Sequence, residues 1–365
     1  MDTSHSPPFN YTLSCNSSES VPYTARQVIQ CVTTLSVLTI ITLLTVLGNV
    51  LVIASIAYFT KLQTPTNAFI LSLATADILV GLVVMPFSMV KAVFGWYFGR
   101  IFCKIHSIMD VMLCTSSIVN LSCIAFDRYF AVCYPLKYRF TMSRKRVTFL
   151  LLICWILPAL VSIVPLVLDL HVIGLEDSFE QLDSQDCVFV VNIPYSVTAS
   201  IIAFYLPMPV ILVAYAKIFL VATNQVREIA ARQQGMNLEM IQQNSSIRKE
   251  RKAAKTLGII IGCFLLCWVP FFTLNIIDPL LGYQADSILI EVFLWLGYLN
   301  SGLNPFLYAF FNKSFRRAFS MIISCKIITK DCHYNSLAGS TKLNTRLKTI
   351  SRQFTLTSEL FDEEE

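Results

Sequence analysis

Seven stretches of this chain stay apolar over about twenty or more residues each, and this pattern limits the possible folds more than any other feature. A helix rises about 1.5 Å per residue, so about twenty residues cross the roughly 30 Å hydrocarbon core of a bilayer. Strands of a membrane barrel would instead alternate apolar and polar residues over about ten positions. We therefore predict an all-α membrane protein, a seven-transmembrane helix bundle with spans at about 29–58, 66–91, 101–133, 146–168, 192–223, 254–279 and 288–311.

The charges of the connecting loops predict the orientation of the bundle. The loops at 134–146 and 224–255 are rich in Lys and Arg, which marks cytoplasmic loops, whereas the loop at 169–187 is acidic and has neither. With seven spans the N-terminus is then extracellular, where Asn10 and Asn16 are predicted glycosylation sites. We expect a plasma-membrane protein with an extracellular N-terminus at 1–28, a bundle at 29–311, an amphipathic eighth helix at 312–324 and a cytoplasmic tail at 325–365.

Other classes of protein find less support in the sequence. The net charge of +5 does not indicate a nucleic-acid partner, because the basic residues gather beside the predicted inner leaflet, where membrane lipid is the expected partner. The sequence contains no Gly-rich phosphate loop, metal-ligand spacing or nucleophile motif, so we predict no catalytic residue, no metal site and no organic cofactor. A transporter, which would be expected to show repeat symmetry and broken helices, is kept as a remote alternative.

Charged side chains inside the third span are costly in a membrane and therefore indicate function. Asp110 lies near the outer end of this span, and the pair Asp127 and Arg128 lies about 27 Å away at its inner end. A carboxylate near the outer surface needs a cation, and no Lys or Arg lies at comparable depth in another span. We therefore predict that the ammonium group of a ligand is the counter-ion of Asp110.

Further polar residues in the spans leave two interpretations open. They form either hydrogen bonds that hold helices together, or a hydrated polar core that binds a sodium ion or water and rearranges on activation. Prolines at 86, 158, 207, 270 and 305 are expected to kink their helices and provide hinges. The residues of the predicted sodium or water site are Asn49, Asp77 and Asn300.

A series of short motifs follows the order of the spans. The motifs are "GNVLV" at 48–52, "LATAD" at 73–77, "DRY" at 127–129, Trp155, Pro207 with Tyr215, "CWVP" at 267–270 and "NPFLY" at 304–308. Together they resemble the rhodopsin-like (class A) G-protein-coupled receptors across nearly the whole membrane region. The segments "CTSSI" after Asp110, "FDRYFAVCYPLKY" and "WLGYLNSGLNPFLYAFF" make the chain most similar to the trace amine-associated receptors.

The resemblance implies a receptor for an extracellular amine, such as a trace amine, diamine or polyamine. It also implies a heterotrimeric G protein of the stimulatory, cyclic-AMP-raising class as partner, with arrestin and receptor kinases as further partners and olfaction as a role common among relatives. A monoamine neurotransmitter receptor for serotonin or histamine is the alternative. The predicted ligand-binding residues are Asp110, Cys114, Ser200, Trp268, Phe271, Phe272, Glu291, Trp295 and Tyr298.

Two details refine the expected ligand. The fifth span offers only Ser200, between Ala199 and Ala203, where catecholamine receptors have several serines, so an arylalkylamine or alkylamine is favoured over a catechol. Glu291 lies seven residues outward of Tyr298 on one helix face, about 10 Å away, which suits a second ammonium group. A solvated residue at the helix end is the alternative for Glu291.

At the cytoplasmic end, the resemblance implies an ion pair between Arg128 and Glu250 that holds the third and sixth helices together at rest. Cys325, just beyond the basic segment "NKSFRRAF", is a candidate palmitoylation site. The predicted activation switch consists of Asp127, Arg128, Tyr215, Glu250, Asn304, Pro305 and Tyr308.

Two cysteines lie on the oxidising outer side of the membrane, and we predict a disulfide between them, Cys103 and Cys187. Trace amine-associated receptors often carry a second bridge from the N-terminal tail to the same loop. Because Cys187 is the only cysteine in that loop, Cys15 or Cys31 has no evident partner.

Overall fold

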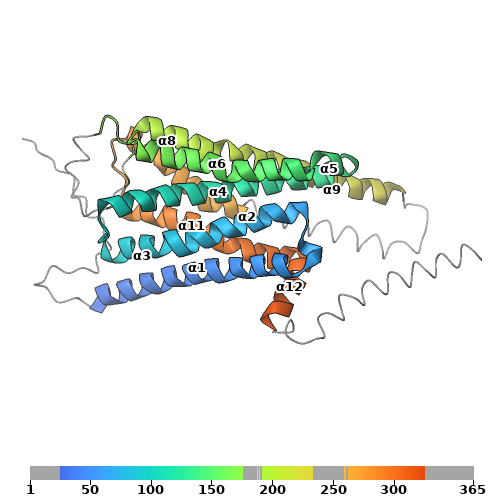
Figure 1. The fold of residues 1–365 in the computed structure, drawn as a ribbon, viewed down its shortest axis with the longest axis horizontal. Coiled ribbons are helices and arrows are strands. Elements are labelled where there is room, and N and C mark those ends of the chain that lie inside the picture. Colours follow the sequence, from blue (N-terminus) through green and yellow to red (C-terminus); the bar gives the residue numbers. More distant parts are fainter. Residues whose placement is uncertain are drawn as a thin grey trace, which may run out of the picture.

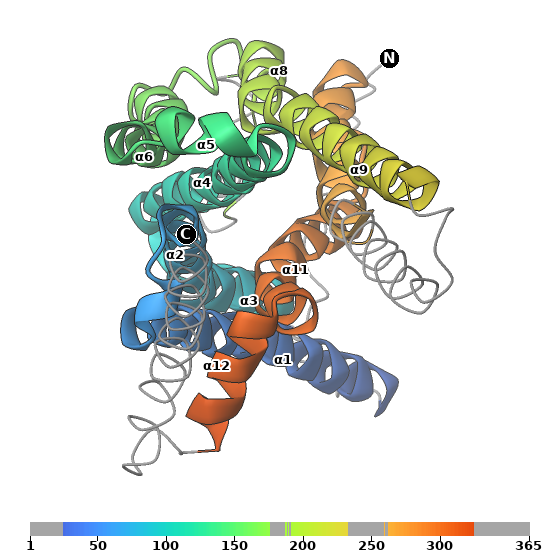
Figure 2. The same ribbon diagram turned by 90° about the vertical axis from the view of Figure 1, so that its right-hand side faces the viewer.

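A computed structural model gives the structure of this chain and describes residues 25–175, 187, 189, 191–232, 259 and 262–324. Within these residues every regular element is a helix. Figure 1 shows the long helices side by side along the long axis of the molecule, and Figure 2 shows them from one end. The predicted all-α bundle is confirmed.

The helices follow the predicted spans closely. Two short helices, α5 and α12, lie at the end of the molecule where α4 and α11 finish (Figure 1). The helices are α1 (Ala25–Tyr58), α2 (Pro65–Leu79), α3 (Met85–Phe94), α4 (Gly99–Cys133), α5 (Pro135–Thr141), α6 (Arg144–Val167), α8 (Ile193–Ser200), α9 (Pro207–Arg232), the unlabelled Gly262–Leu280 helix, α11 (Ser287–Phe311) and α12 (Lys313–Ile323).

Six of the described helical stretches are long and apolar enough to cross a membrane. The seventh, α11, is 25 residues long but is not among the six. It carries the polar side chains of Asn300, Ser301 and Asn304, all of which are buried, so they face the protein rather than lipid. The face of α11 that packs into the bundle is therefore partly polar.

Helix starts follow local capping chemistry. The Thr64 side chain accepts a hydrogen bond from the backbone N–H of Asn67 (3.3 Å), and Pro65 begins α2. Asn192 caps α8 in the same way through the N–H of Tyr195 (3.0 Å), and Asn312 caps α12 through the N–H of Ser314 (3.0 Å). The polar residues between the apolar stretches therefore mark where each helix begins.

Two of the predicted proline kinks take the form of π-helical turns. Residues Val80–Val84 and Ile201–Tyr205 each form such a turn, and Pro86 and Pro207 follow. The N–H of Leu206 donates to the carbonyl of Ile201, five residues back (2.8 Å). Proline has no N–H and its ring clashes with the carbonyl four residues back, so the wider turn accommodates it without breaking the helix.

The centre of the bundle is α4. In its most apolar window 61% of the residues are buried, compared with 22% in α1 and in α6, which lie at the periphery. Figure 2 shows α4 between α2, α6 and α9. Both charged ends of the third span are therefore held on a helix that other helices surround.

Candidate functional site

A cavity lies among α4, α8 with the π-helical turn that follows it, and the Gly262–Leu280 helix. It encloses about 530 Å³ when the adjoining space open to solvent is included. Six predicted ligand-binding residues line it, namely Asp110, Cys114, Ser200, Trp268, Phe271 and Phe272. The other lining residues are Val111, Thr115, Phe189, Tyr195, Ala199, Ala203, Asn275 and Leu294.

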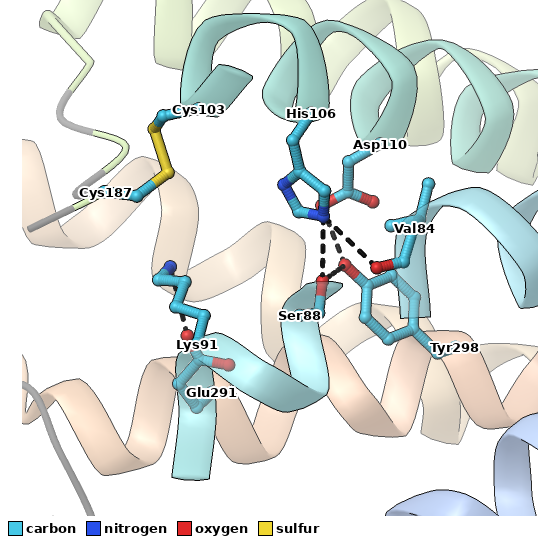
Figure 3. A network of polar contacts seen from close by, with 9 residues as sticks. All are labelled: Val84, Ser88, Lys91, Cys103, His106, Asp110, Cys187, Glu291 and Tyr298. Carbon is cyan, nitrogen blue, oxygen red and sulfur yellow. Dashed lines mark hydrogen bonds and ion pairs between the residues drawn. A yellow bond between two sulfur atoms is a disulfide. The ribbon is translucent and has the colours of Figure 1, made fainter. Parts of the chain in front are cut away.

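The Asp110 carboxylate forms one wall of this cavity. Its Oδ2 atom accepts a hydrogen bond from the Tyr298 hydroxyl (2.8 Å), and its Oδ1 atom accepts one from the Cys114 thiol (3.3 Å). Ser88 lies 3.3 Å from the Tyr298 hydroxyl and 3.3 Å from Nε2 of His106 (Figure 3). A chain of hydrogen bonds across α3, α4 and α11 therefore holds the carboxylate in place.

No Lys, Arg or His side chain forms an ion pair with Asp110 in the part of the chain that the structure describes. The ion pairs found there are Lys91 with Glu291 (3.2 Å), Lys104 with Asp169 (2.8 Å) and Arg128 with Asp127 (3.5 Å). The two donors to Asp110 are a neutral hydroxyl and a neutral thiol. A buried carboxylate with only neutral donors is a strong site for a cation.

Aromatic rings cover the inner end of the cavity. Trp268 is 1% exposed, and its ring centroid lies 6.2 Å from that of Phe271 and 5.6 Å from that of Phe272. A Cβ atom added to Gly297 would lie 2.6 Å from the Trp268 ring, so only glycine at this position of α11 leaves room for the indole. These rings offer apolar surface and π faces close to the Asp110 carboxylate.

Polar groups line the side of the cavity that α8 and the Gly262–Leu280 helix form. The Nδ2 atom of Asn275 donates to the Ser200 hydroxyl (2.9 Å), and the Ser196 hydroxyl donates to the Asn275 carbonyl. The Tyr195 hydroxyl is buried and has no hydrogen-bond partner among the described residues. A ligand could therefore meet hydrogen-bonding groups at the end opposite its ammonium.

The sequence interpretation missed Asn275 and Tyr195. Asn275 follows Trp268 by seven residues, which places the two on one helix face, and that spacing was a usable signal. Tyr195 starts the fifth span five residues before Ser200, where its orientation depends on how the π-helical turn and α8 are packed. Only the tertiary structure shows that it lines the cavity.

Three predicted ligand-binding residues on α11 do not line this cavity. Tyr298 is fully buried and contacts Asp110, and Trp295 packs edge-on against Tyr298 with ring centroids 5.3 Å apart. Glu291 is paired with Lys91 (3.2 Å), so it is not a freely solvated helix-end residue, and the predicted second ammonium would meet a carboxylate that a protein cation already contacts. The predicted span ended at Lys91, whereas α3 continues to Phe94, which places this cation inside the bundle.

The outer loop is tied to the top of α4. Cys103 and Cys187 form a disulfide, as predicted, with Cα atoms 5.6 Å apart. Phe189, two residues further on, lines the cavity and stacks on His171 with ring centroids 6.1 Å apart. Cys31, whose pairing the sequence left open, is also disulfide-bonded.

The predicted sodium or water site lies deeper in the bundle. Asp77 is fully buried, and its two oxygens accept hydrogen bonds from the Ser117 hydroxyl (2.9 Å) and from Nδ2 of Asn304 (2.8 Å). Nδ2 of Asn49 donates to the Ser301 carbonyl (3.1 Å). The Asn49 Oδ1 and Asn300 Nδ2 atoms are buried without a partner among the described residues. Such unpaired amide groups are typical of sites that hold water.

At the opposite end of α4, Asp127 is satisfied by the protein itself. Its oxygens accept hydrogen bonds from the hydroxyls of Thr66 (2.8 Å) and Tyr138 (2.8 Å), and Arg128 lies 3.5 Å away. Burial raises the pKa of Tyr138, so its hydroxyl stays protonated as the donor.

The remaining switch residues are distributed around this end. Tyr215 is buried in the core, and the Tyr308 ring stacks on Phe315 of α12 with centroids 5.5 Å apart. Pro305 lies within α11. The predicted residues that lie outside the described part of the chain are Asn10, Asn16, Glu250 and Cys325.

Comparison with known proteins agrees with this architecture. A family model described as 7 transmembrane receptor (rhodopsin family) matches residues 48–308. The human 5-hydroxytryptamine receptor 4 is 43% identical over 313 residues, covering 81% of each chain. Trace amine-associated receptor 4 of Rattus norvegicus is 42% identical over 323 residues, covering 88% of this chain and 93% of the relative. The human trace amine-associated receptor 1 is 42% identical over 290 residues, covering 78% and 85%. This chain, with its buried α4 and its motifs in register on successive helices, belongs to the rhodopsin family of seven-transmembrane receptors.

Proposed function

We propose that this protein is a plasma-membrane receptor that binds an extracellular amine and responds by activating a heterotrimeric G protein. One observation carries the proposal: the Asp110 carboxylate faces a cavity and has only neutral hydrogen-bond donors among the described residues. A ligand ammonium supplies the missing positive charge. The trace amine and 5-hydroxytryptamine receptors among its relatives are named for ligands that carry such a group.

The walls of the cavity support an arylalkylamine as the ligand class. Phe271 and Phe272 provide aromatic contacts worth roughly 0.5 to 2 kcal/mol for each good cation–π geometry, and they accept an aryl ring equally well. Trp268 closes the inner end. A ligand of this class places its ammonium at Asp110 and its ring between these side chains.

A serotonin-like monoamine is the second candidate, and the polar far end favours it. Ser200 and Asn275 form a hydrogen-bonded pair that can receive a ring hydroxyl or an indole N–H. The relatives do not separate the two candidates, because they are similar to this chain at 43% and 42% identity. A comparison of serotonin with tryptamine on Ser200→Ala separates the two candidates. If the ring hydroxyl of serotonin binds Ser200, serotonin loses potency in the variant and tryptamine does not.

Signal transmission is proposed to follow a population shift between closed and open bundles. In this scheme the N-terminus is extracellular, and the end with Arg128, Tyr215 and Tyr308 faces the G protein, of the stimulatory class. Glu250 is proposed to restrain the closed state, and Glu250→Ala is then expected to raise ligand-free signalling at equal surface expression. The same proposal includes arrestin and receptor kinases as further partners. It also includes lipid attachment at Cys325 and a chemosensory role.

A sodium ion near Asp77 is part of the proposal as well. The carboxylate of Asp77 and the hydroxyl of Ser117 are oxygen donors, which suit a hard monovalent cation. When bound, the ion would supply a positive charge between α2, α4 and α11. Raising sodium at constant ionic strength should then lower agonist affinity in the wild type but not in Asp77→Asn.

The experiment that tests the main proposal is an amine screen in transfected cells. Cyclic AMP is measured over 2-phenylethylamine, tyramine, tryptamine, serotonin, histamine, pentylamine and 1,5-diaminopentane, with untransfected cells as control. A concentration-dependent rise for at least one amine is expected. If none raises cyclic AMP or displaces another from receptor present at the cell surface, the amine function is refuted.

A further inference from the structure

An ion pair joins α3 and α11 on the extracellular side of the Asp110 network. The Lys91 Nζ atom lies 3.2 Å from Oε1 of Glu291, and both side chains are largely buried, with exposures of 28% and 21%. Lys91 follows Ser88 by three residues, and Glu291 precedes Tyr298 by seven, so the pair lies one to two helical turns outward of the network (Figure 3).

The Glu291 carboxylate is held within the protein. The second carboxylate oxygen of Glu291, Oε2, is buried and has no hydrogen-bond partner among the described residues. A ligand arriving from the cavity cannot reach that oxygen without moving its surroundings. With Oε1 paired to Lys91 and Oε2 buried, Glu291 offers a ligand no free carboxylate.

We propose that the Lys91–Glu291 ion pair makes this receptor selective for ligands with a single ammonium group. The inference rests on the proposed amine site at Asp110. A diamine with one ammonium at Asp110 needs a second anion, and Glu291 is the acidic residue of α11 that lies two turns outward of Tyr298. Because Lys91 already neutralises Glu291, the second ammonium would have to share the carboxylate with the like charge of Lys91 or displace Lys91.

The shape of the cavity agrees with this selectivity. The cavity extends from Asp110 toward α8 and the Gly262–Leu280 helix, and Leu294 is the α11 residue in its lining. Neither Lys91 nor Glu291 lines it. The space next to the amine site is thus bounded by aromatic and apolar side chains with a few neutral polar groups, and an uncharged ligand tail fits it better than a second ammonium.

The test compares two amines of matched length, pentylamine and 1,5-diaminopentane, on the wild type and on Lys91→Gln. The readouts are cyclic AMP and displacement of whichever amine from the screen activates the receptor. We expect the wild type to favour pentylamine by at least about tenfold. Lys91→Gln frees the Glu291 carboxylate, so the potency of the diamine relative to pentylamine should rise by about tenfold, which corresponds to about 1.4 kcal/mol.

Two control variants make the result specific. The double variant Lys91→Gln with Glu291→Gln should lose the gain, because no carboxylate is left for the second ammonium. Lys104→Gln removes the same charge from the separate pair with Asp169 and should leave the ratio unchanged. Equal potency of the two amines on the wild type, or no relative gain in Lys91→Gln, would overturn the inference. A wild type that responds only to the diamine would likewise overturn the inference, whereas a receptor that binds none of the amines in the screen would refute the amine function itself.

Discussion

Two aspartates on the same helix have opposite relations to their surroundings. At the inner end of α4, Asp127 is fully buried and receives two hydroxyl hydrogen bonds, with a guanidinium 3.5 Å away. At the outer end, Asp110 receives a hydroxyl and a thiol and borders a cavity. The protein supplies the counter-charge of Asp127 itself, whereas no ion pair with Asp110 forms among the described residues.

Under the proposed function, this difference lets one helix serve both binding and restraint. A carboxylate whose partners are complete stabilises one arrangement of α2, α4 and α5. A carboxylate whose partners are incomplete is less stable in its charged form, and a bound cation stabilises it. Each prediction below changes one end and asks whether the other end responds.

The largest effect is expected from Asp110→Asn, which keeps the size of the side chain but removes its charge. Breaking a buried ion pair costs about 3 to 5 kcal/mol, so agonist potency should fall roughly a hundredfold or more. Concentration–response curves at matched surface expression measure this. Asp127→Asn is the matched variant at the inner end and should raise ligand-free signalling while keeping potency within about tenfold. Unchanged potency in Asp110→Asn would break the comparison.

The next effect concerns the disulfide, which exists only at the outer end. Replacing Cys103 or Cys187 by serine should cost about 2 to 5 kcal/mol and release Phe189 from above the cavity. We expect strongly reduced surface expression, and lost agonist binding in the receptor that remains, measured with a tagged protein. Cys263→Ser, which changes a free cysteine, is the control. Both cysteines recovered as free thiols in folded receptor would contradict the assignment.

A smaller effect is expected when one tyrosine hydroxyl is deleted at either end of α4. Tyr298→Phe and Tyr138→Phe each delete one hydroxyl that donates to an aspartate on α4. Losing such a bond costs about 1 kcal/mol, or roughly fivefold. Tyr298→Phe should lower agonist potency without raising basal signalling, and Tyr138→Phe should do the reverse. The same phenotype in both variants would mean that the two ends are not independent.

The smallest effect is a pH dependence at the outer end. Burial lowers the pKa of His171 below its usual value, although its hydrogen bond to the Pro165 carbonyl acts in the opposite direction. The folded state therefore favours the neutral ring, and stability is lost as the pH falls below the unfolded pKa of about 6.5. Because His171 stacks on Phe189, agonist potency should fall modestly between pH 7.5 and 5.5. His171→Gln should remove that change, and an identical pH profile in the variant would count against it.

Much of the fold could be predicted because membrane insertion imposes a simple physical rule on sequence. A helix satisfies its own backbone hydrogen bonds in lipid, so length and apolarity identify the spans, and loop charges suggest their orientation. The predicted span at 101–133 and helix α4 (Gly99–Cys133) agree within a few residues. The prolines indicated where helices depart from regular α-helical geometry. They did not indicate that Pro86 and Pro207 follow π-helical turns, because the shape of the turn depends on packing against neighbouring helices.

The sequence by itself determined the family and the spans and singled out Asp110 as a candidate ligand contact, because each rests on residue type and spacing along the chain. Only the tertiary structure decided which side chains from different helices meet. It joined Glu291 to Lys91, connected His106 to Asp110 through Ser88 and Tyr298, and placed Asn275 beside Ser200. The physical reason is that a hydrogen bond or ion pair depends on distances of a few ångströms between helices, which the pattern within one helix does not specify.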